Sequence, residues 1–383
     1  MKFFKKVAAL LLAVMILVST TACGSKDESW SYKVGDTQLS KGVYMFALLS
    51  YYSQAQTLAS EDEKYDANKS FLNIKVQGEN DESPMKAKNW IVEKTDEMCR
   101  AMLVVATKCK EYGIELSEET LTSIQESAQS DWTNGPYYEY YQSLGYESTP
   151  YQDILEPYGI TYEDFEYAAY TTSELQYQLF LELYGEGGEM EVPKDELTTY
   201  FLENYTDYKY ISVSLTNTVT DSESGEESTT AMTETEVANV KKELEAYVTG
   251  LNNGKMTWDD VTTDYQVENE LTSDPTVSGT EVIENSYYLS QNLIDALNSL
   301  DEGKATIVES GEDTSAVMYI IYKGKIADQK ATYIDDETYI DSVLVDCKST
   351  DFSDYIDSLT DTIGISKNRA VTSKYKPYMF MQY

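Results

Sequence analysis

The side chains of this 383-residue sequence that could do chemistry are its tyrosines, its carboxylates and four cysteines, because the chain contains no histidine. Catalytic triads, acid–base pairs and zinc sites that depend on histidine are therefore excluded. Four cysteines are too few for a disulfide scaffold. Cys99 and Cys109 lie on one predicted helix, separated by a rise of about 15 Å, so they cannot pair with each other. Cys347 could pair with either one, and no motif marks any of the three as a nucleophile.

Cys23 follows a segment with the features of an export signal. Three lysines among the first six residues precede an apolar run at residues 7–18, which is too short to span a bilayer. Residues 1–22 are therefore predicted to be a signal peptide. The sequence Thr-Thr-Ala-Cys-Gly at residues 20–24 resembles the lipobox of bacterial lipoproteins. This implies a lipid on Cys23, a polar tether at 23–29 and a location on the outer face of the bacterial cytoplasmic membrane. Ordinary secretion with cleavage nearby is the alternative.

The chain is strongly acidic, with 67 Asp and Glu residues against 29 Lys and Arg residues and a formal net charge of −38. Nucleic acid is not an expected partner, because its phosphates would be repelled. The charge favours basic or unfolded polypeptide segments, although each acidic run taken singly is explained by a solvated surface. No phosphate-binding Gly-x-x-x-x-Gly-Lys-Ser/Thr motif is present. A faint similarity to a calcium loop at 221–225 fails because Met232 stands at the twelfth position. No cofactor or metal is expected.

Residues 208–323 have the pattern of one small α/β module. The segment begins with a strand-like run at 208–215, rich in aromatic and β-branched residues. It ends with two further runs on either side of a turn sequence, which predicts a hairpin. The other predicted elements are an acidic loop at 216–235, helices at 236–251, around Trp258 and at 289–300, and the hairpin strands at 305–308 and 316–322.

Four pieces of this module resemble the parvulin-type peptidyl-prolyl isomerases. They are residues 209–215, residues 253–261 with Tyr265, residues 293–303, and residues 319–323. The chain as a whole resembles the extracytoplasmic foldase lipoproteins of the PrsA/SurA type. In that group a parvulin module sits within a helical chaperone domain.

The parvulin resemblance implies a proline pocket with an altered polar wall. The two histidine positions of the family fall at Ser212 and Tyr319, and its acidic or thiol position falls within residues 279–282 without a clear candidate. The apolar floor is better kept, with Leu289 where the family has Met and Leu293 where it has Phe. The resemblance thus implies peptide binding at Leu289 and Leu293 without the catalytic histidines. Both leucines are also compatible with an ordinary core.

The rest of the chain is predicted to be mainly helical. One predicted helix begins after the capping residue Ser40, and another spans 85–112 with Gly113 as the stop. A third spans 161–184 from a capping-box start at Thr161, and a fourth spans 194–204 after Pro193. The last two cover 339–347 and 352–363, with a polar break between them. The aromatic tail at 375–383 is costly to leave in water. We therefore expect it to pack against the N-terminal domain.

Five residues at 137–141 read Tyr-Tyr-Glu-Tyr-Tyr, within a chain that holds 34 tyrosines. One interpretation is an adhesive aromatic surface for unfolded polypeptides. The other is that tyrosine is simply this protein's usual half-buried residue. The sequence favours the second interpretation.

Together these observations predict an α+β protein with a mainly helical chaperone body and an inserted parvulin-like module. The predicted segments are a signal peptide at 1–22, a tether at 23–29, a helical domain at 30–205, the module at 206–325 and C-terminal helices with a tail at 326–383. The expected function is a membrane-anchored folding chaperone that binds newly exported polypeptides. The alternatives are an active prolyl isomerase and a solute-binding lipoprotein.

Overall fold

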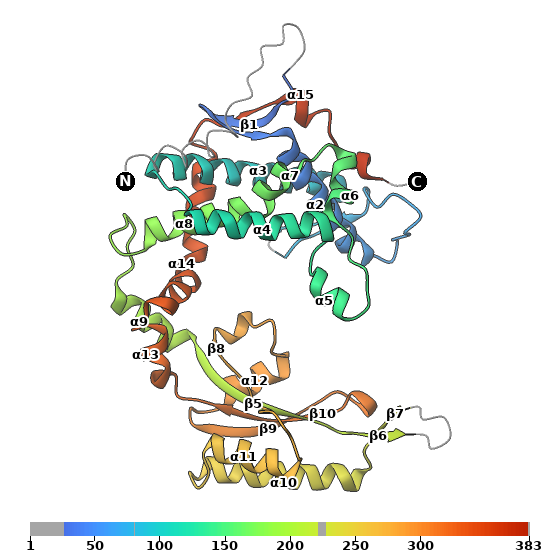
Figure 1. The fold of residues 1–383 in the computed structure, drawn as a ribbon, viewed down its shortest axis with the longest axis vertical. Coiled ribbons are helices and arrows are strands. Elements are labelled where there is room, and N and C mark those ends of the chain that lie inside the picture. The colour runs from blue at the N-terminus through green and yellow to red at the C-terminus, as the bar shows by residue number, and fades with distance from the viewer. Residues whose placement is uncertain (1–26, 80, 221–226, 382–383) are drawn as a thin grey trace. The chain divides into compact units, whose positions relative to one another are not determined.

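The computed structural model describes residues 27–79, 81–220 and 227–381, which form two compact units (Figure 1). The body unit comprises the described residues up to Met190 together with those from Ser349 onward, and the sheet unit comprises the described residues of Glu191–Lys348. The body unit is mainly helical with small antiparallel sheets, and the sheet unit has one four-stranded sheet with helices. The predicted α+β class is therefore confirmed. Cys23 and the calcium-like segment 221–225 lie outside the described residues.

Three long helices form the frame of the body unit, and the start of one and the end of another lie at the capping residues that the sequence predicted. Helix α2, Lys41–Ser60, begins after Ser40, whose hydroxyl accepts a hydrogen bond from the Val43 amide. Helix α3, Ala87–Tyr112, ends at Gly113, which has a φ of 71° that glycine adopts without strain. Helix α4 spans Glu118–Asn134. The shorter helices of this unit are α5 (Tyr138–Ser143), α6 (Tyr151–Leu155), α7 (Tyr162–Glu166), α8 (Thr172–Tyr184) and α15 (Arg369–Thr372).

The predicted helix at 161–184 is continuous but not uniformly α-helical. Thr161 forms the expected capping box with Asp164 at the start of α7. A π-helical turn, Tyr167–Thr171, then separates α7 from α8. The Thr172 hydroxyl donates a 2.9 Å hydrogen bond to the Tyr167 carbonyl oxygen, which helps to satisfy that group where the regular pattern is interrupted. Hydrophobic spacing does not distinguish such a turn from ordinary helix.

The two ends of the described chain meet in a three-stranded sheet of the body unit. Strand β1, Trp30–Val34, pairs antiparallel with β2, Thr37–Ser40, and with β11, Ser366–Lys367. Asn368 follows β11 and is buried. Its side-chain amide donates hydrogen bonds to the carbonyl oxygens of Asp27 at 2.7 Å and Trp30 at 2.8 Å. Its side-chain oxygen accepts one from the Ala370 amide at 3.0 Å.

We expect Asn368→Ala to destabilise the protein by about 1–3 kcal/mol, because it leaves two partly buried carbonyl oxygens without their hydrogen-bond donor. Urea unfolding of the soluble chain measures this change. Asn89→Ala, at an exposed position of α3, is the matched control and should change the free energy of unfolding by less than about 0.5 kcal/mol. Equal effects of the two substitutions would contradict this role of Asn368.

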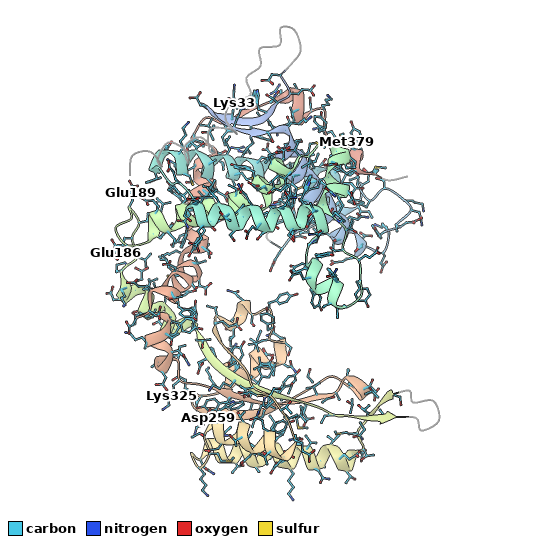
Figure 2. All side chains as sticks on the ribbon, viewed as in Figure 1. Lys33, Glu186, Glu189, Asp259, Lys325 and Met379 are labelled. Atoms are coloured by element: carbon cyan, nitrogen blue, oxygen red, sulfur yellow. The ribbon has the colours of Figure 1, made fainter. Side chains whose placement is uncertain are left out.

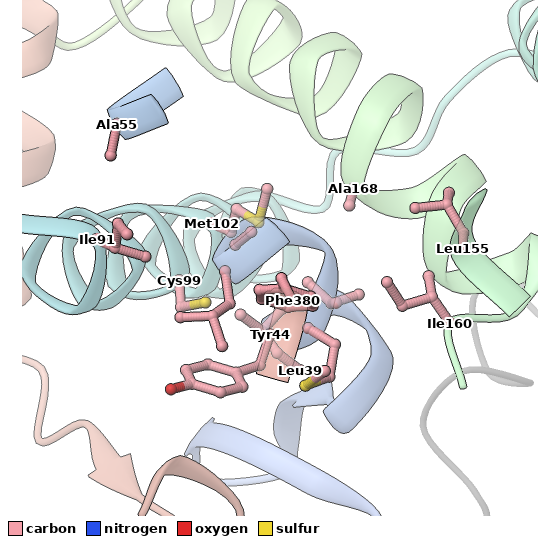
Figure 3. Packing of buried hydrophobic residues seen from close by; sticks show 14 of the residues in the cluster. Leu39, Tyr44, Ala55, Ile91, Cys99, Met102, Leu155, Ile160, Ala168 and Phe380 are labelled. Carbon is pink, nitrogen blue, oxygen red and sulfur yellow. The ribbon is translucent and has the colours of Figure 1, made fainter. Parts of the chain in front are cut away.

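Helices α2 and α3 and the C-terminal tail all contribute to the core of the body unit, together with residues of other elements such as Leu155 and Ala168 (Figure 3). Tyr44 from α2 and Cys99 from α3 are buried in the same cluster as Phe380 of the tail turn η6, Pro377–Phe380. The Phe380 ring contacts Tyr52 with a centroid distance of 5.4 Å and Tyr158 with one of 4.9 Å. Burial of aromatic side chains on this scale is a strong driving force. The tail is therefore an integral part of this core.

The sheet unit is organised around four antiparallel strands in the order β8–β5–β10–β9 (Figure 1). Their bounds are β5, Thr206–Ser214; β8, Val277–Glu281; β9, Lys304–Ser310; and β10, Val317–Lys323. The predicted hairpin of the last two strands is confirmed by their pairing. Helices α10, Glu234–Asn252, and α11, Trp258–Glu268, pack on one face through Ile211, Met318 and Ile320. Helix α12, Gln291–Ser299, packs on the other face through Tyr208 and Ile321.

Two predictions for the sheet unit and its flanks were wrong. The segment 216–235, predicted as a loop, contains strands β6, Thr216–Thr220, and β7, Glu227–Ala231, which pair antiparallel. Threonine and valine on either side of the acidic stretch favour extended backbone. The predicted polar break near residue 350 is absent from α14, Glu337–Thr360. Residues 348–351 contain neither Gly nor Pro, so these polar residues do not interrupt the helix. The unit also contains α9, Lys194–Asn204, as predicted, and α13, Lys330–Tyr333.

Candidate functional site

The face of the sheet that α12 covers carries the positions implied by the parvulin resemblance. Ser212 on β5 and Tyr319 on β10 are direct partners in the antiparallel register. Ser212 is exposed and Tyr319 is half-buried. The two positions where the family has histidines are thus side by side, and they present two hydroxyl groups instead of two imidazoles.

An acidic residue stands in the stretch where the sequence offered no clear candidate. Glu281, at the end of β8, accepts hydrogen bonds at one carboxylate oxygen from the Tyr208 hydroxyl at 2.7 Å and from the Ser286 hydroxyl at 2.8 Å. Ser286 in turn accepts a hydrogen bond from the Leu289 amide at 3.2 Å. Burial and the Glu281 carboxylate raise the pKa of Tyr208 above its usual range. Gly279 is required beside this group, because a Cβ there would lie 2.5 Å from the Tyr208 hydroxyl oxygen.

Leu289 and Leu293 are covered by the chain itself. Their side chains are 6% and 2% exposed and belong to the cluster beneath α12. The more accessible part of this face is aromatic. The Tyr210 ring meets the Tyr319 ring edge-on with a centroid distance of 5.7 Å and lies parallel to Tyr208 at 6.4 Å. A bound peptide would meet these rings before it met the two leucines, whose role in peptide binding stays a prediction.

The chemistry available on this face is hydrogen bonding and aromatic contact. Proton transfer at neutral pH needs a group whose pKa lies near 7. Burial raises the pKa of both Tyr208 and Tyr210 above the usual value for tyrosine, which takes them further from that range. The arrangement of these side chains therefore favours binding over acid–base catalysis.

A pair of carboxyl groups lies on the opposite face of the sheet unit, between α10 and α11. Glu243 has one oxygen that is buried without a hydrogen-bond partner among the described residues. Burial, followed by the neighbouring Glu268, raises the pKa of Glu243. The Tyr247 hydroxyl donates to Glu268 at 2.8 Å, and Asp264 adds negative charge near Tyr247. The ionised form of Glu243 is thus disfavoured in the folded protein.

We expect Glu243→Gln to stabilise the protein at pH 7 and to have little effect near pH 4. A folded-state pKa raised above the unfolded value gives a contribution to stability that is present at low pH and is lost as the pH rises through the raised pKa. Glutamine stays neutral, so this loss disappears. The gain at pH 7 should be on the order of 0.5 kcal/mol after allowance for partial exposure. Thermal unfolding between pH 4 and 8 measures it, with exposed Glu245→Gln as control. A gain that does not change with pH would contradict this account.

The aromatic loop, residues 136–148, connects α4 to α6 in the body unit and includes α5. No residue of α5 is buried. The exposed fractions of its side chains reach 75% at Tyr137, 63% at Tyr140 and 66% at Tyr146. Further exposed large side chains in the loop are Tyr138, Tyr141 and Leu144. The sequence favoured half-buried tyrosines here, whereas the structure places these side chains in an exposed aromatic surface.

Hydrogen bonds within the aromatic loop hold its shape. Its ends are joined by the Ser148 hydroxyl, which donates to the Pro136 carbonyl oxygen at 3.0 Å. The Tyr141 amide donates to the Tyr137 carbonyl oxygen at 3.0 Å, and the Tyr146 amide donates to the Tyr141 carbonyl oxygen at 2.9 Å. Tyr137 has a φ of 55°, a left-handed conformation that costs an ordinary residue about 1–2 kcal/mol. The loop is therefore an ordered display of tyrosines closed at its base, as in a compact surface loop.

A smaller exposed pair lies in the sheet unit. Tyr287 and Tyr288 are 92% and 80% exposed, and their rings meet edge-on with a centroid distance of 5.5 Å. They directly precede the buried Leu289. Each unit therefore presents adjacent tyrosines to solvent.

Cys99 and Cys109 are not arranged for catalysis. Both are buried free thiols on α3, and they are not paired with each other, as their spacing predicted. Burial raises the pKa of the Cys109 thiol to about 12 and that of Cys99 above its usual value. Reactive cysteines need a lowered pKa and access to solvent.

Over the described ranges, the structure contains no helix with both the length and the apolar character needed to cross a membrane.

Comparison with known proteins finds similarity among solved structures alone. No family model matches the chain, and no curated protein matches its sequence. The foldase protein PrsA from Streptococcus pneumoniae str. Canada MDR_19A is 16% identical, with 76% of this chain and 95% of that chain covered and a TM-score of 0.35. The foldase protein PrsA from Lactococcus lactis is 12% identical, with coverages of 91% and 99% and the same TM-score of 0.35. Similarity at this level carries no information about activity. Any statement about the function of this chain must rest on its own residues.

Proposed function

We propose that this protein is an extracytoplasmic folding chaperone that binds unfolded, newly exported polypeptides. The observation that carries the proposal is the aromatic loop, in which six exposed large side chains fall within ten residues of a segment closed at its base. The parvulin-like and foldase-like sequence pieces support the same function. The sheet unit acts as a second polypeptide-binding module in this proposal, with its aromatic face at Tyr210 and Tyr319.

Tyrosine suits the recognition of many different unfolded segments. Its ring provides a large contact area with few rotatable bonds, and its hydroxyl can pair with exposed backbone groups. The net charge of −38 favours clients with basic segments through long-range attraction. Binding of this kind needs no nucleotide and consists of many shallow contacts.

The proposal includes attachment to the outer face of the bacterial cytoplasmic membrane through a lipid on Cys23. Its support is the lipobox-like sequence at residues 20–24 after an apolar run. Fractionation of cells that produce the wild-type chain or Cys23→Ser tests this part separately. The wild type should be found with membranes and Cys23→Ser should not form the lipidated species. Identical fractionation and mass of the two proteins would rule out the anchor and leave polypeptide binding untouched.

The direct test of polypeptide binding uses a soluble chain that begins at Gly24. A fluorescently labelled protein that is reduced and alkylated, and therefore permanently unfolded, is titrated with this chain while anisotropy is recorded. We expect saturable binding that weakens with added salt for a basic client, because screening reduces the attraction. The folded form of the same client should not bind. Equal binding of folded and unfolded client, or none of either, would refute the proposal.

Prolyl isomerisation is the second candidate, because Ser212 and Tyr319 are partners at the positions that the resemblance assigns to catalysis. Exchange spectroscopy on short X–Pro peptides decides between the two functions. We expect unchanged cis/trans exchange rates with excess protein, since no imidazole is present and the pKa values of the nearby tyrosines are raised. A clear acceleration would establish an isomerase with a hydroxyl-lined pocket.

The solute-binding alternative predicts two similar α/β lobes, which the helical body unit and the antiparallel sheet unit do not provide.

A further inference from the structure

A cavity of about 840 Å³ in the body unit gathers three lysines from distant parts of the sequence. Lys88 comes from the first turn of α3, Lys367 from β11, and Lys376 from the residue before the tail turn η6, in which Met379 is labelled in Figure 2. The chain has more than twice as many acidic as basic residues. A group of lysines around one cavity therefore runs against the charge of the protein as a whole.

Two of these ammonium groups have no carboxylate partner within the described chain. Lys88 donates to the neutral side-chain oxygen of Asn73 at 3.1 Å. Lys376 is half-buried and forms no ion pair with a described residue. Burial and the charge of Lys367 lower the pKa of Lys376. A cation held in this way, beside another cation, is stabilised when an anion binds.

The carboxylates in the cavity wall do not cancel this positive charge. Asp96 already interacts with Lys367 and accepts a hydrogen bond from the Tyr32 hydroxyl, and it lies 3.9 Å from the Arg100 guanidinium. Glu93 is exposed, so solvent and salt screen its charge. Lys88 is exposed as well, so the partly buried charge left without a carboxylate partner is that of Lys376.

The remaining wall of the cavity is largely apolar. Its apolar side chains are Leu72, Val92, Pro377 and Tyr378, and its neutral polar ones are Ser70, Asn73 and Asn89. Apolar walls with a few convergent charged groups are typical of sites for small molecules. The cavity also shares Ser70 with a second cavity of about 730 Å³, which is lined by aromatic side chains including Tyr52, Phe71 and Phe380. Apolar surface therefore continues beyond the lysines.

We propose that this cavity binds a carboxylate or phosphate anion that carries an apolar group, with Lys376 and Lys88 as the groups that recognise the anion. An organic acid and the C-terminal carboxylate of an apolar polypeptide share this chemistry. The inference does not depend on chaperone activity, since either ligand would bind to the body unit alone.

Calorimetric titration of the soluble chain from Gly24 tests the proposal with four probes. They are N-acetyl-Ala-Ala-Phe with a free carboxylate, its C-terminal amide, 3-phenylpropanoate and inorganic phosphate. We expect the peptide acid to bind about tenfold or more tightly than the amide, because a charge-assisted hydrogen bond is lost in the amide. Phosphate should compete with the acid. Tighter binding of the peptide acid than of 3-phenylpropanoate supports a polypeptide terminus, and the reverse order supports a small organic acid.

Substitution of Lys376 identifies the site. Lys376→Met should weaken binding of the preferred acid by about tenfold or more, whereas Lys376→Arg should retain most of it. Lys110→Met, at an exposed position near the end of α3 and outside the cavity, is the control and should bind as the wild type does. Lys376→Met breaks no ion pair with the described residues, so its melting temperature should stay at or above that of the wild type. Equal binding of acid and amide, no binding of any anion, or an unchanged affinity in Lys376→Met would overturn the proposal.

Discussion

Replacement of Tyr137, Tyr140 and Tyr146 by asparagine is expected to weaken the binding of unfolded polypeptide by about tenfold or more. These are the most exposed side chains of the aromatic loop, so they lose little by substitution in the folded protein. Truncation of an aromatic residue that becomes buried in an interface commonly costs more than about 1 kcal/mol. Anisotropy with the permanently unfolded client measures the affinity of the triple variant and the wild type. Their melting temperatures should agree within a few degrees, which shows that the fold is kept.

The matched control is the double variant Tyr287→Asn and Tyr288→Asn in the sheet unit. Both side chains are even more exposed, and they have the same chemistry. We expect a smaller loss of affinity than in the triple variant, because two isolated rings offer less contact than the ordered loop. Full affinity in the triple variant, or equal losses in both variants, would show that the aromatic loop is not the main binding surface.

Leu293→Ala is expected to reduce the stability of the sheet unit by about 2–5 kcal/mol. Leu293 is 2% exposed in the cluster beneath α12, and removal of a buried leucine side chain leaves a cavity in addition to the lost transfer free energy. Urea unfolding, monitored by the hydrogen exchange of amides in the sheet unit, measures the loss of stability. Below the unfolding transition, affinity for unfolded client should change little.

Leu271→Ala provides the comparison at a leucine of the same unit that is 42% exposed. Its effect on the free energy of unfolding should stay below about 0.5 kcal/mol. If Leu293→Ala proved as mild as Leu271→Ala yet lowered the affinity for peptide, Leu293 would belong to an open pocket, as the parvulin resemblance implies, and not to the core.

Helix boundaries were the part of the fold most accessible from the sequence, because they depend on local interactions. Ser40, Thr161 and Pro193 each begin a helix at the predicted place, and Gly113 ends one. Capping and left-handed termination involve only nearby residues, so no knowledge of the tertiary structure was needed.

Features that depend on pairing or on uninterrupted packing were less accessible. The β6–β7 hairpin flanks an acidic stretch whose composition resembles a loop. The polar residues at 348–351 suggested a helix break, yet α14 continues through them because they have no disruptive backbone preference. The π-helical turn after α7 leaves the apolar spacing nearly unchanged.

The candidate sites needed three-dimensional information. Ser212 and Tyr319 were placed from the resemblance, but the pairing of Glu281 with Tyr208 depends on how β8 is aligned with β5. The exposure of the aromatic loop depends on which tyrosines pack into a core in the folded protein, and composition alone favoured burial of these side chains. Lys88 and Lys376 lie almost three hundred residues apart, so only the folded body unit brings them to one cavity.

The central claim, that this chain protects unfolded polypeptides, is tested most directly by client aggregation. A disulfide-containing client is reduced so that it unfolds, and light scattering is followed with and without the soluble chain from Gly24. The account predicts suppression near equimolar ratio for the wild type and much weaker suppression for the triple tyrosine variant. Unchanged aggregation at every ratio of wild-type protein to client would contradict the chaperone function.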